Sequence, residues 1–183
     1  MATGTSTIEL SLKEIGQLYE TLDPYPFRER DLDRDAEAYI VGWARELPLD
    51  HAFRIVVHLP PAEVAKPAAA ELGAGMKRFF DLRAEAIDRD LRELLRIGRM
   101  SLLIGVIVLA ACVAAAQYSD SLLAPGPLLT ITRESLIILG WVANWRPLEI
   151  FLYEWWPIAR RRNLHRRLAA ATVEVRPWAD AAA

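Results

Sequence analysis

Residues 97–118 read IGRMSLLIGVIVLAACVAAAQY, and this stretch decides the class of protein. Arg99 is its only charged residue, and residues 100–117 carry no charge at all. An α-helix rises about 1.5 Å per residue, so roughly 20 residues cross the ~30 Å hydrocarbon layer of a membrane. The length of this run predicts a transmembrane helix over residues 99–118, with a buried core helix of a soluble protein as the alternative.

A second apolar stretch follows after a short connection. Residues 128–145 read LLTITRESLIILGWVANW, and the turn-forming sequence APGP precedes them at residues 124–127. We expect an outer loop over residues 119–127 and a second transmembrane helix over residues 128–147. Because the loop is short, the two helices should form an antiparallel hairpin.

The positively charged residues predict how this hairpin is oriented. Arginines precede the first span and follow the second, whereas residues 119–132 contain neither Lys nor Arg. Positive residues stay on the cytoplasmic side, so we expect a multi-pass inner-membrane protein with both termini in the cytoplasm. Aromatic residues agree, with Tyr118 at the outer interface and four others at the inner one: Trp145, Tyr153, Trp155 and Trp156. The excess of arginine over lysine and the abundant alanine indicate a bacterial source.

Residues 1–75 are too apolar for a disordered tail, and we predict a small cytoplasmic α+β domain. Alternation predicts a strand over residues 7–12, while capping-box spacing from Ser11 predicts a helix through Leu22. A second helix should begin at Asp33 or Asp35 and end near Leu47, with Tyr39, Ile40, Trp43 and Leu47 on its apolar face. Strands are expected over residues 53–59 and, returning from the C-terminus, over residues 172–176.

A stalk helix over residues 76–98 should join this domain to the first span without a break, as one helix from about Met76 to Gln117. Its apolar residues are spaced 4, 3, 4 and 3 apart, which is typical of a coiled-coil seam. The seam predicts a homo-oligomer, and packing on the chain's own soluble domain is the alternative. Its residues are Phe80, Ala84, Ile87, Leu91 and Leu94. The fold class is therefore a cytoplasmic α+β domain, a long stalk helix and a two-helix transmembrane hairpin, mainly α overall.

Two pairs of charged residues lie in or beside the second span. Arg133 and Glu134 are candidates to line a pore, and the alternative is that they lie at the level of the lipid headgroups. Arg146 and Glu149 are three residues apart and can pair on one helix face.

The last segment, residues 148–183, combines an aromatic interfacial stretch, a basic cluster and the C-terminal strand. Its basic cluster next to a membrane predicts binding of anionic lipids, while docking onto the acidic N-terminal domain is the alternative. The candidate lipid-binding residues are Arg160, Arg161, Arg162, Arg166 and Arg167. The cluster is short and the formal net charge of the chain is -2, so we do not expect a nucleic-acid partner.

The sequence contains no motif for catalysis, metal binding or cofactor binding. It has one cysteine and three histidines without metal-ligand spacing, and no glycine-rich nucleotide motif. Asp31, Asp33 and Asp35 resemble a calcium loop only superficially, and we interpret them as an acidic helix start. We therefore expect no enzyme, no cofactor and no metal.

These features predict a homo-oligomeric membrane scaffold or regulatory module that presents its cytoplasmic domain to a partner protein. The alternative is a homo-oligomeric ion channel or transport subunit, because a single two-span hairpin cannot enclose a path.

Overall fold

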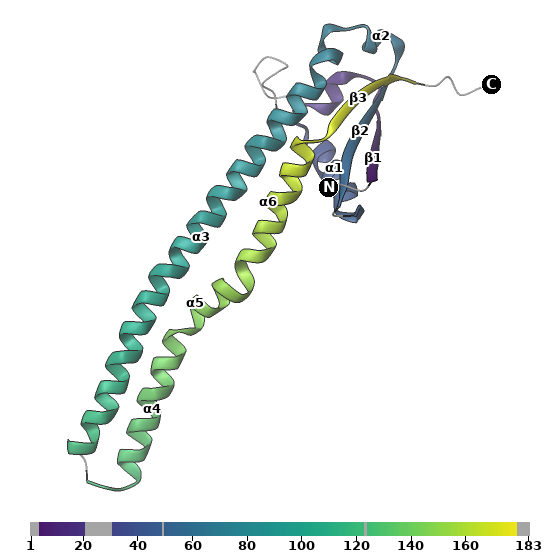
Figure 1. The fold of residues 1–183 in the computed structure, drawn as a ribbon. Coiled ribbons are helices and arrows are strands. Elements are labelled where there is room, and N and C mark those ends of the chain that lie inside the picture. The colour runs from purple at the N-terminus through teal and green to yellow at the C-terminus, as the bar shows by residue number, and fades with distance from the viewer. Residues whose placement is uncertain (1–3, 21–30, 49, 123, 179–183) are drawn as a thin grey trace. The chain divides into compact units, whose positions relative to one another are not determined.

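The computed structural model describes residues 4–20, 31–48, 50–122 and 124–178, and it is mainly helical with one small sheet (Figure 1). The chain divides into two units. Residues 1–86 and 161–183 form the sheet unit, and residues 87–160 form the helical unit.

The secondary-structure elements follow the order expected from the sequence, with a few additional short helices. The strands are β1 (Gly4–Ser11), β2 (His51–Leu59) and β3 (Thr172–Pro177). The short helices are the 3₁₀-helix η1 (Ile15–Leu18), α2 (Pro61–Val64), α5 (Trp145–Glu149) and the π-helix η2 (Ile150–Glu154). The longer helices are α1 (Arg34–Glu46), α3 (Pro67–Leu122), α4 (Pro127–Ala143) and α6 (Trp155–Ala169).

The sheet has the order β1-β2-β3, and both pairs of neighbouring strands are parallel. Ile55 in the central strand pairs with Ile8 on one side and Val173 on the other. Parallel strands cannot be joined by a tight turn and need a crossover connection. Helix α1 lies in the first crossover, and the whole helical unit lies in the second.

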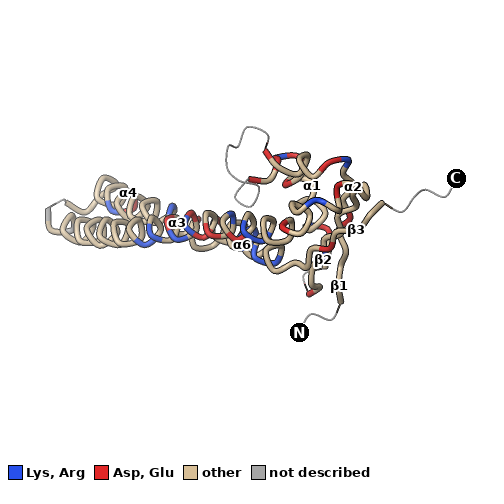
Figure 2. Tube along the Cα trace, turned by 90° about the horizontal axis from the view of Figure 1, so that it is seen from above, with Lys and Arg blue, Asp and Glu red and all other residues tan. Residues whose placement is uncertain are grey.

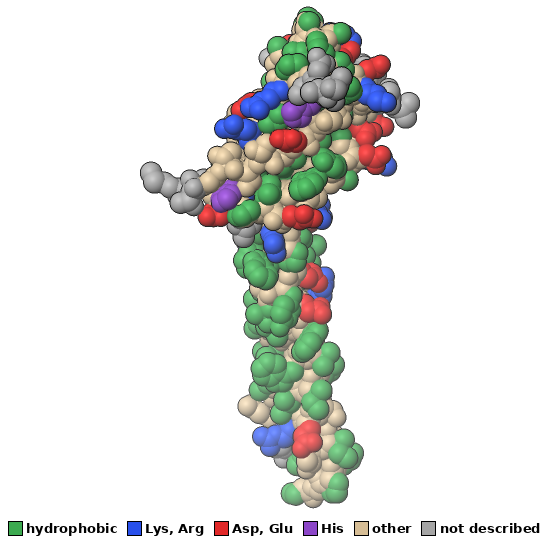
Figure 3. Space-filling model, turned by 90° about the vertical axis from the view of Figure 1, so that its right-hand side faces the viewer, with side chains coloured by type: hydrophobic (Ala, Val, Ile, Leu, Met, Phe, Trp, Pro, Cys, Tyr) green, Lys and Arg blue, Asp and Glu red, His purple; other side chains and the backbone are tan. Residues whose placement is uncertain are grey.

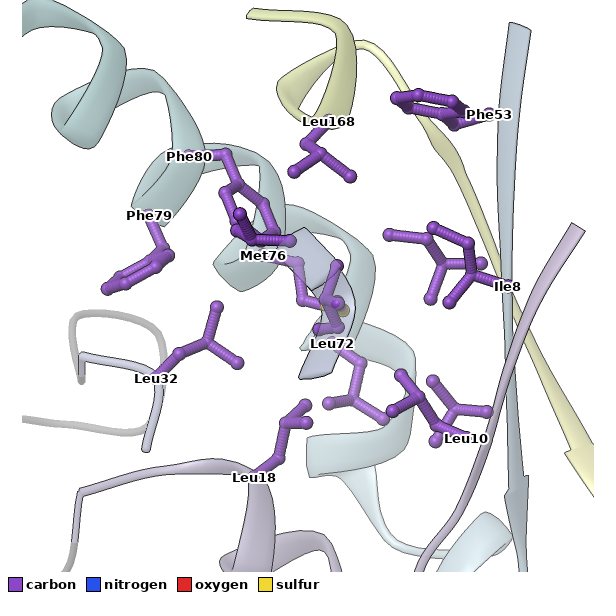
Figure 4. Close-up of a cluster of buried hydrophobic side chains, with 14 of the residues drawn as sticks. Ile8, Leu10, Leu18, Leu32, Phe53, Leu72, Met76, Phe79, Phe80 and Leu168 are labelled. Atoms are coloured by element: carbon purple, nitrogen blue, oxygen red, sulfur yellow. The ribbon is translucent and has the colours of Figure 1, made fainter. Parts of the chain in front are cut away.

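The two faces of the sheet differ in character. One face carries Ile8, Leu10, Ile55 and Val57, which join a continuous core with side chains from α1, α3 and α6 (Figure 4). The other face carries Val56 flanked by polar and charged residues, among them Glu9, Arg54, His58 and Glu174. The alternation that predicted the strands therefore reflects a sheet covered by helices on one face.

The three predicted strands are confirmed, and so is the helix capped by Asp33. Its Oδ1 accepts hydrogen bonds from the backbone N–H groups of Asp35 at 2.9 Å and Ala36 at 3.4 Å. The predicted helix from Ser11 is wrong within the described residues, because the backbone N–H of Leu12 continues the sheet by donating to the carbonyl of His58 at 3.0 Å. Only the short η1 follows, and residues 21–30, with the expected helix end, lie outside the described residues.

The predicted apolar face of α1 is only partly right. Ile40, Val41 and Ala44 are buried, whereas Tyr39 and Trp43 remain 47% and 48% exposed. The rings of these two residues pack on each other, with centroids 6.3 Å apart. The buried stripe is narrow, so the flanking aromatic side chains are left half in solvent.

Helix α3 is longer than the predicted helix and spans 56 residues. Gly75 does not break it, and a Cβ there would lie 2.9 Å from the hydroxyl of Tyr19. Glycine therefore lets the sheet unit pack closely at this turn. Burial, with a contribution from Glu71, raises the pKa of that Tyr19 hydroxyl to about 12.

Helix α3 contains a stretch long and apolar enough to cross a membrane, with a mean hydropathy of 2.3. The continuous second span predicted over residues 128–147 is interrupted instead. Helix α4 ends at Ala143, and α5 begins at Trp145. Pro147 explains the interruption, because it lacks the N–H that would bond the carbonyl of Ala143.

The core predicts the effect of truncating its central strand. Ile55 is fully buried, so Ile55→Ala should lower the free energy of unfolding by about 2–5 kcal/mol. Thr7→Ala, on the exposed face of β1, is the control and should change it by less than about 0.5 kcal/mol. Urea unfolding of the full chain in mild detergent, followed by near-UV circular dichroism, measures both. Equal effects of the two variants would contradict the one-sided core.

Candidate functional site

The helical unit is a hairpin in which α3 packs against the returning helices at four small residues. Gly98, Gly105, Cys112 and Ser119 are spaced by seven and are all buried. A seven-residue repeat keeps one helix face toward its partner. This repeat of small residues is a sequence signal that the analysis of apolar spacing missed.

The contacts of three glycines show how closely the helices approach. A Cβ at Gly98 would lie 2.8 Å from Cγ2 of Ile150, and one at Gly140 would lie 2.7 Å from Cδ1 of Leu109. At Gly105 a Cβ would lie 2.7 Å from Oδ1 of Asn144 and 3.0 Å from the carbonyl oxygen of Ala143. No side chain larger than hydrogen fits these positions without a shift.

Asn144 is buried between the helices and joins them by hydrogen bonds. Its Nδ2 donates to the carbonyl oxygens of Gly105 on α3 and Gly140 on α4, each at 3.0 Å. Its own backbone N–H bonds the carbonyl of Trp141 at 3.0 Å instead of continuing the α-helical pattern to Gly140. The side-chain amide thus takes over a carbonyl that the helix break leaves free. Sequence reasoning passed over this residue because one asparagine in an apolar run carries no motif.

Arg146, just after the break, pairs with two acidic residues. Its Nη1 lies 3.3 Å from Oε2 of Glu149, and it also forms an ion pair with Glu154 across the π-helix η2. All three side chains are partly exposed. The pairing of Arg146 with Glu149 is present, and its part in a pore stays a prediction.

Arg133 and Glu134 are exposed on α4 and form no ion pair with any described residue. Each therefore faces the surroundings of the hairpin and not a path enclosed by a single chain. Their role at a pore mouth or among lipid headgroups stays a prediction.

The arginines of the basic cluster of α6 differ in how far they are exposed. Arg160, Arg161 and Arg166 are exposed, while Arg162 donates to Oδ1 of Asn163. The guanidinium of Arg167 lies 4.1 Å from the centre of the Phe53 ring.

Arg167 is held inside the sheet unit. Its Nη2 donates to the carbonyl oxygens of Pro48 and His51, each at 2.8 Å. Burial lowers the pKa of Arg167, and the nearby Asp50 opposes that shift. These contacts tie the end of α6 to the start of β2, and lipid binding by Arg167 stays a prediction.

His165, near the same end of α6, is buried and lies in a second network of polar residues. Its Nδ1 lies 2.9 Å from the carbonyl oxygen of Arg161, and its Nε2 lies 3.8 Å from Oε1 of Glu37. Arg83 donates to the other oxygen of Glu37 at 3.0 Å. This network joins α1, α3 and α6 within the sheet unit.

The predicted oligomer seam is covered within the single chain. Phe80 belongs to the core of the sheet unit, and three further members, Ala84, Ile87 and Leu91, are at most 6% exposed. Leu94 is half-buried. A second copy would contact these side chains only after they were uncovered, so their burial favours the intramolecular alternative.

Two buried polar side chains of the sheet unit, Ser6 and Glu63, form hydrogen bonds within the fold. Oγ of Ser6 lies 2.8 Å from Nδ1 of His51, but Ser6 is buried and the two residues lie on paired strands. Glu63 is buried and accepts hydrogen bonds from Lys66 and the backbone N–H of Ile15, which together lower its pKa. Over the described ranges, no three or more His, Cys, Asp or Glu side chains are grouped to hold a metal.

Large apolar side chains cover the outside of the hairpin (Figure 3). Charged residues lie along the first part of α3 and the second part of α6. Helix α3 carries no charged residue from Met100 to Ser119 (Figure 2). The most distinctive surface of this unit is therefore its apolar exterior.

Comparisons of the chain with protein-family models, with curated proteins and with solved structures find no match.

The close approach at Gly105 makes a direct prediction. Gly105→Leu should separate the helices near Asn144 and lower hairpin stability by about 1–3 kcal/mol. Ala114→Leu, at an exposed position of α3, is the matched control and should have little effect. Titration with SDS of the chain in mild detergent, followed by tryptophan fluorescence, measures the unfolding midpoint. If both variants unfold at the wild-type SDS concentration, the tight helix contact is wrong.

Proposed function

We propose that this chain is a two-span integral membrane protein that anchors its sheet unit at the cytoplasmic face of an inner membrane and presents it to a partner protein. The observation that carries the proposal is the apolar exterior of the helical hairpin. The scaffold or regulatory role follows from the combination of this anchor with a small, open-faced sheet.

The exposure of the apolar stretch favours a membrane helix over the core helix of a soluble protein. Only 17% of the most apolar window of α3 is buried. Ile107 on α3 is 60% exposed and Ile138 on α4 is 62% exposed. A soluble protein rarely exposes contiguous apolar patches of more than a few hundred Å². Lipid is the solvent that suits this surface.

The second span is supported by the length and ends of α4. Its 17 residues rise about 25 Å, and the charged residues Arg146 and Glu149 follow only after the break. Trp145, Tyr153 and Trp156 are exposed just after it. Aromatic residues with one polar end prefer the interface between lipid and water. This supports an inner boundary near α5 and η2.

The open face of the sheet is the part of the sheet unit that suits a protein partner. Arg54 lies 3.4 Å from Glu174, and Nε2 of His58 lies 3.6 Å from Glu9, all on the face opposite the core. The pair of Arg54 and Glu174 is partly exposed and contributes little to stability, so its charges are available to a complementary surface. Strands β1 and β3 are also the edges of the sheet, where another chain can add backbone hydrogen bonds.

The channel alternative is favoured by one observation, the exposed charges of Arg133 and Glu134 on α4, which form no ion pair with a described residue. A ring of several copies would be needed to bring them around a path. The channel therefore requires assembly, whereas the scaffold does not.

Membrane insertion and topology test the proposal. Alkaline carbonate should leave the chain in the membrane pellet, and reporters fused after residue 122 and at the C-terminus should lie on opposite sides, with the C-terminus inside. Release into the carbonate supernatant, or reporters on the same side, would contradict the two-span arrangement. Ile107→Arg should reduce insertion by about 3 kcal/mol, while Leu82→Arg, at a half-exposed position of the sheet unit, should not.

Native mass measurement in mild detergent separates scaffold from channel. A channel requires several copies, and Arg133→Ala and Glu134→Ala should then change its conductance in liposomes. A monomer would exclude both the channel and the homo-oligomeric form of the scaffold. A stable oligomer without conductance would favour the scaffold.

A further inference from the structure

A hollow on one side of α3 brings arginines and apolar side chains together. The part nearer the N-terminus of α3 is formed by Arg89, Arg92 and Arg96, and the part nearer its C-terminus by Ile97, Met100 and Ile104. Apart from the adjacent Arg96 and Ile97, these positions recur every three or four residues, so they lie along one side of the helix. This face lies beside the one that packs on the returning helices through Gly98 and Gly105.

The arginines of this hollow are available to a ligand. Arg89 and Arg96 form no ion pair with any residue that the structure describes. Arg92 contacts Oδ2 of Asp88 through Nε at 3.2 Å, yet its side chain stays 71% exposed. Exposed guanidinium groups offer several N–H donors, in a fork that matches the oxygens of a phosphate.

We propose that this hollow binds the headgroup of an anionic phospholipid, with the acyl chain along Ile97, Met100 and Ile104. The inference rests on the proposed membrane insertion of α3 and adds a specific lipid site to it. It concerns residues other than the basic cluster of α6.

The position along the helix fits this assignment. Arg99 is the last charged residue of α3 before the charge-free stretch that begins at Met100. Arg96 precedes Met100 by four residues, a rise of about 6 Å, which is close to the thickness of one headgroup layer. Side chains on a helix lean toward its N-terminus. The side chain of Arg96 therefore reaches away from the hydrocarbon and toward the lipid phosphates, with Arg92 and Arg89 about one and two helical turns farther out, while the apolar side chains stay in the hydrocarbon.

One acidic residue, Glu93, also lines the hollow. Its carboxylate repels a phosphate and reduces the net positive charge of the site. Removing that charge should therefore strengthen binding of an anionic lipid. Glu93→Gln should thus strengthen lipid binding, whereas a general loss of stability would weaken it. This difference separates a specific headgroup site from destabilisation of the chain.

The experiment uses the full chain in mild detergent and measures retained lipid by native mass spectrometry, with phosphatidylglycerol and phosphatidylcholine as probes. The wild-type chain should retain phosphatidylglycerol in preference. The triple variant Arg89→Gln, Arg92→Gln, Arg96→Gln should lose that preference by about fivefold for each arginine. Glu93→Gln should increase it.

A matched triple variant controls for total charge. Arg34→Gln, Arg45→Gln and Lys77→Gln remove three positive charges from exposed positions of the sheet unit and should leave the preference unchanged. Equal preference in wild type and in the Arg89, Arg92 and Arg96 variant would overturn the site, as would a fall with Glu93→Gln. Carbonate extraction of the same chain tests insertion by itself. A chain that stays in the pellet without any lipid preference would refute the lipid site alone.

Discussion

The parallel pairing of β3 with β2 is the constraint on which the whole chain depends. Residues 60–171 separate the two strands, yet Thr172 must reach the position beside Arg54 in the correct register. A parallel pair requires that the chain return to the end where the previous strand began. A long outgoing helix is therefore compatible with this sheet only if other helices bring the chain back. The hairpin is an enlarged crossover connection, and the fold of the sheet unit includes residues from both of its ends.

The hairpin is held together by close packing and polar contacts. In the proposed membrane location the hydrophobic effect would not drive two apolar helices together, so short interhelical distances and hydrogen bonds would stabilise their contact. Gly98, Gly105 and Gly140 provide the short distances, and Asn144 provides the hydrogen bonds. The helix break at Pro147 removes regular backbone bonds at the place where the Asn144 amide replaces one of them. One polar side chain thereby repairs the break and connects the two helices.

Local patterns in the sequence predicted the elements that depend on local interactions. The first strand follows from alternation, the strand over residues 53–59 from its β-branched residues and the prolines after it, and α1 from the cap at Asp33, because these signals act within a few residues. The helix predicted from Ser11 failed because a distant partner, the carbonyl of His58, extends the strand by one more hydrogen bond. The predicted seam, which includes Phe80 and Leu91, is a buried face of α3. Residue spacing alone does not say whether the same chain or a second copy covers that face. Asn144 was missed for a related reason, since its role exists only when α3 and α4 meet.

The exterior of the hairpin also bears on the choice between scaffold and channel. The exposed positions of α3 within the apolar stretch, such as Leu103 and Ile107, are aliphatic. In a ring of copies, the exposed charges inside the predicted spans, apart from Arg99 and Arg146 at the span ends, are Arg133 and Glu134 on α4. These residues lie about 9 Å along the helix from Pro127, so they would form only one mouth of a pore. The remaining exposed face of α4, with Ile138, Leu139 and Val142, is apolar. A path lined by this face would exclude water over most of its length. Ions do not pass a hydrophobic constriction from which water is excluded. The same face needs no adaptation to contact lipid. The distribution of charge along α4 therefore favours a hairpin that anchors the sheet unit over one that conducts ions.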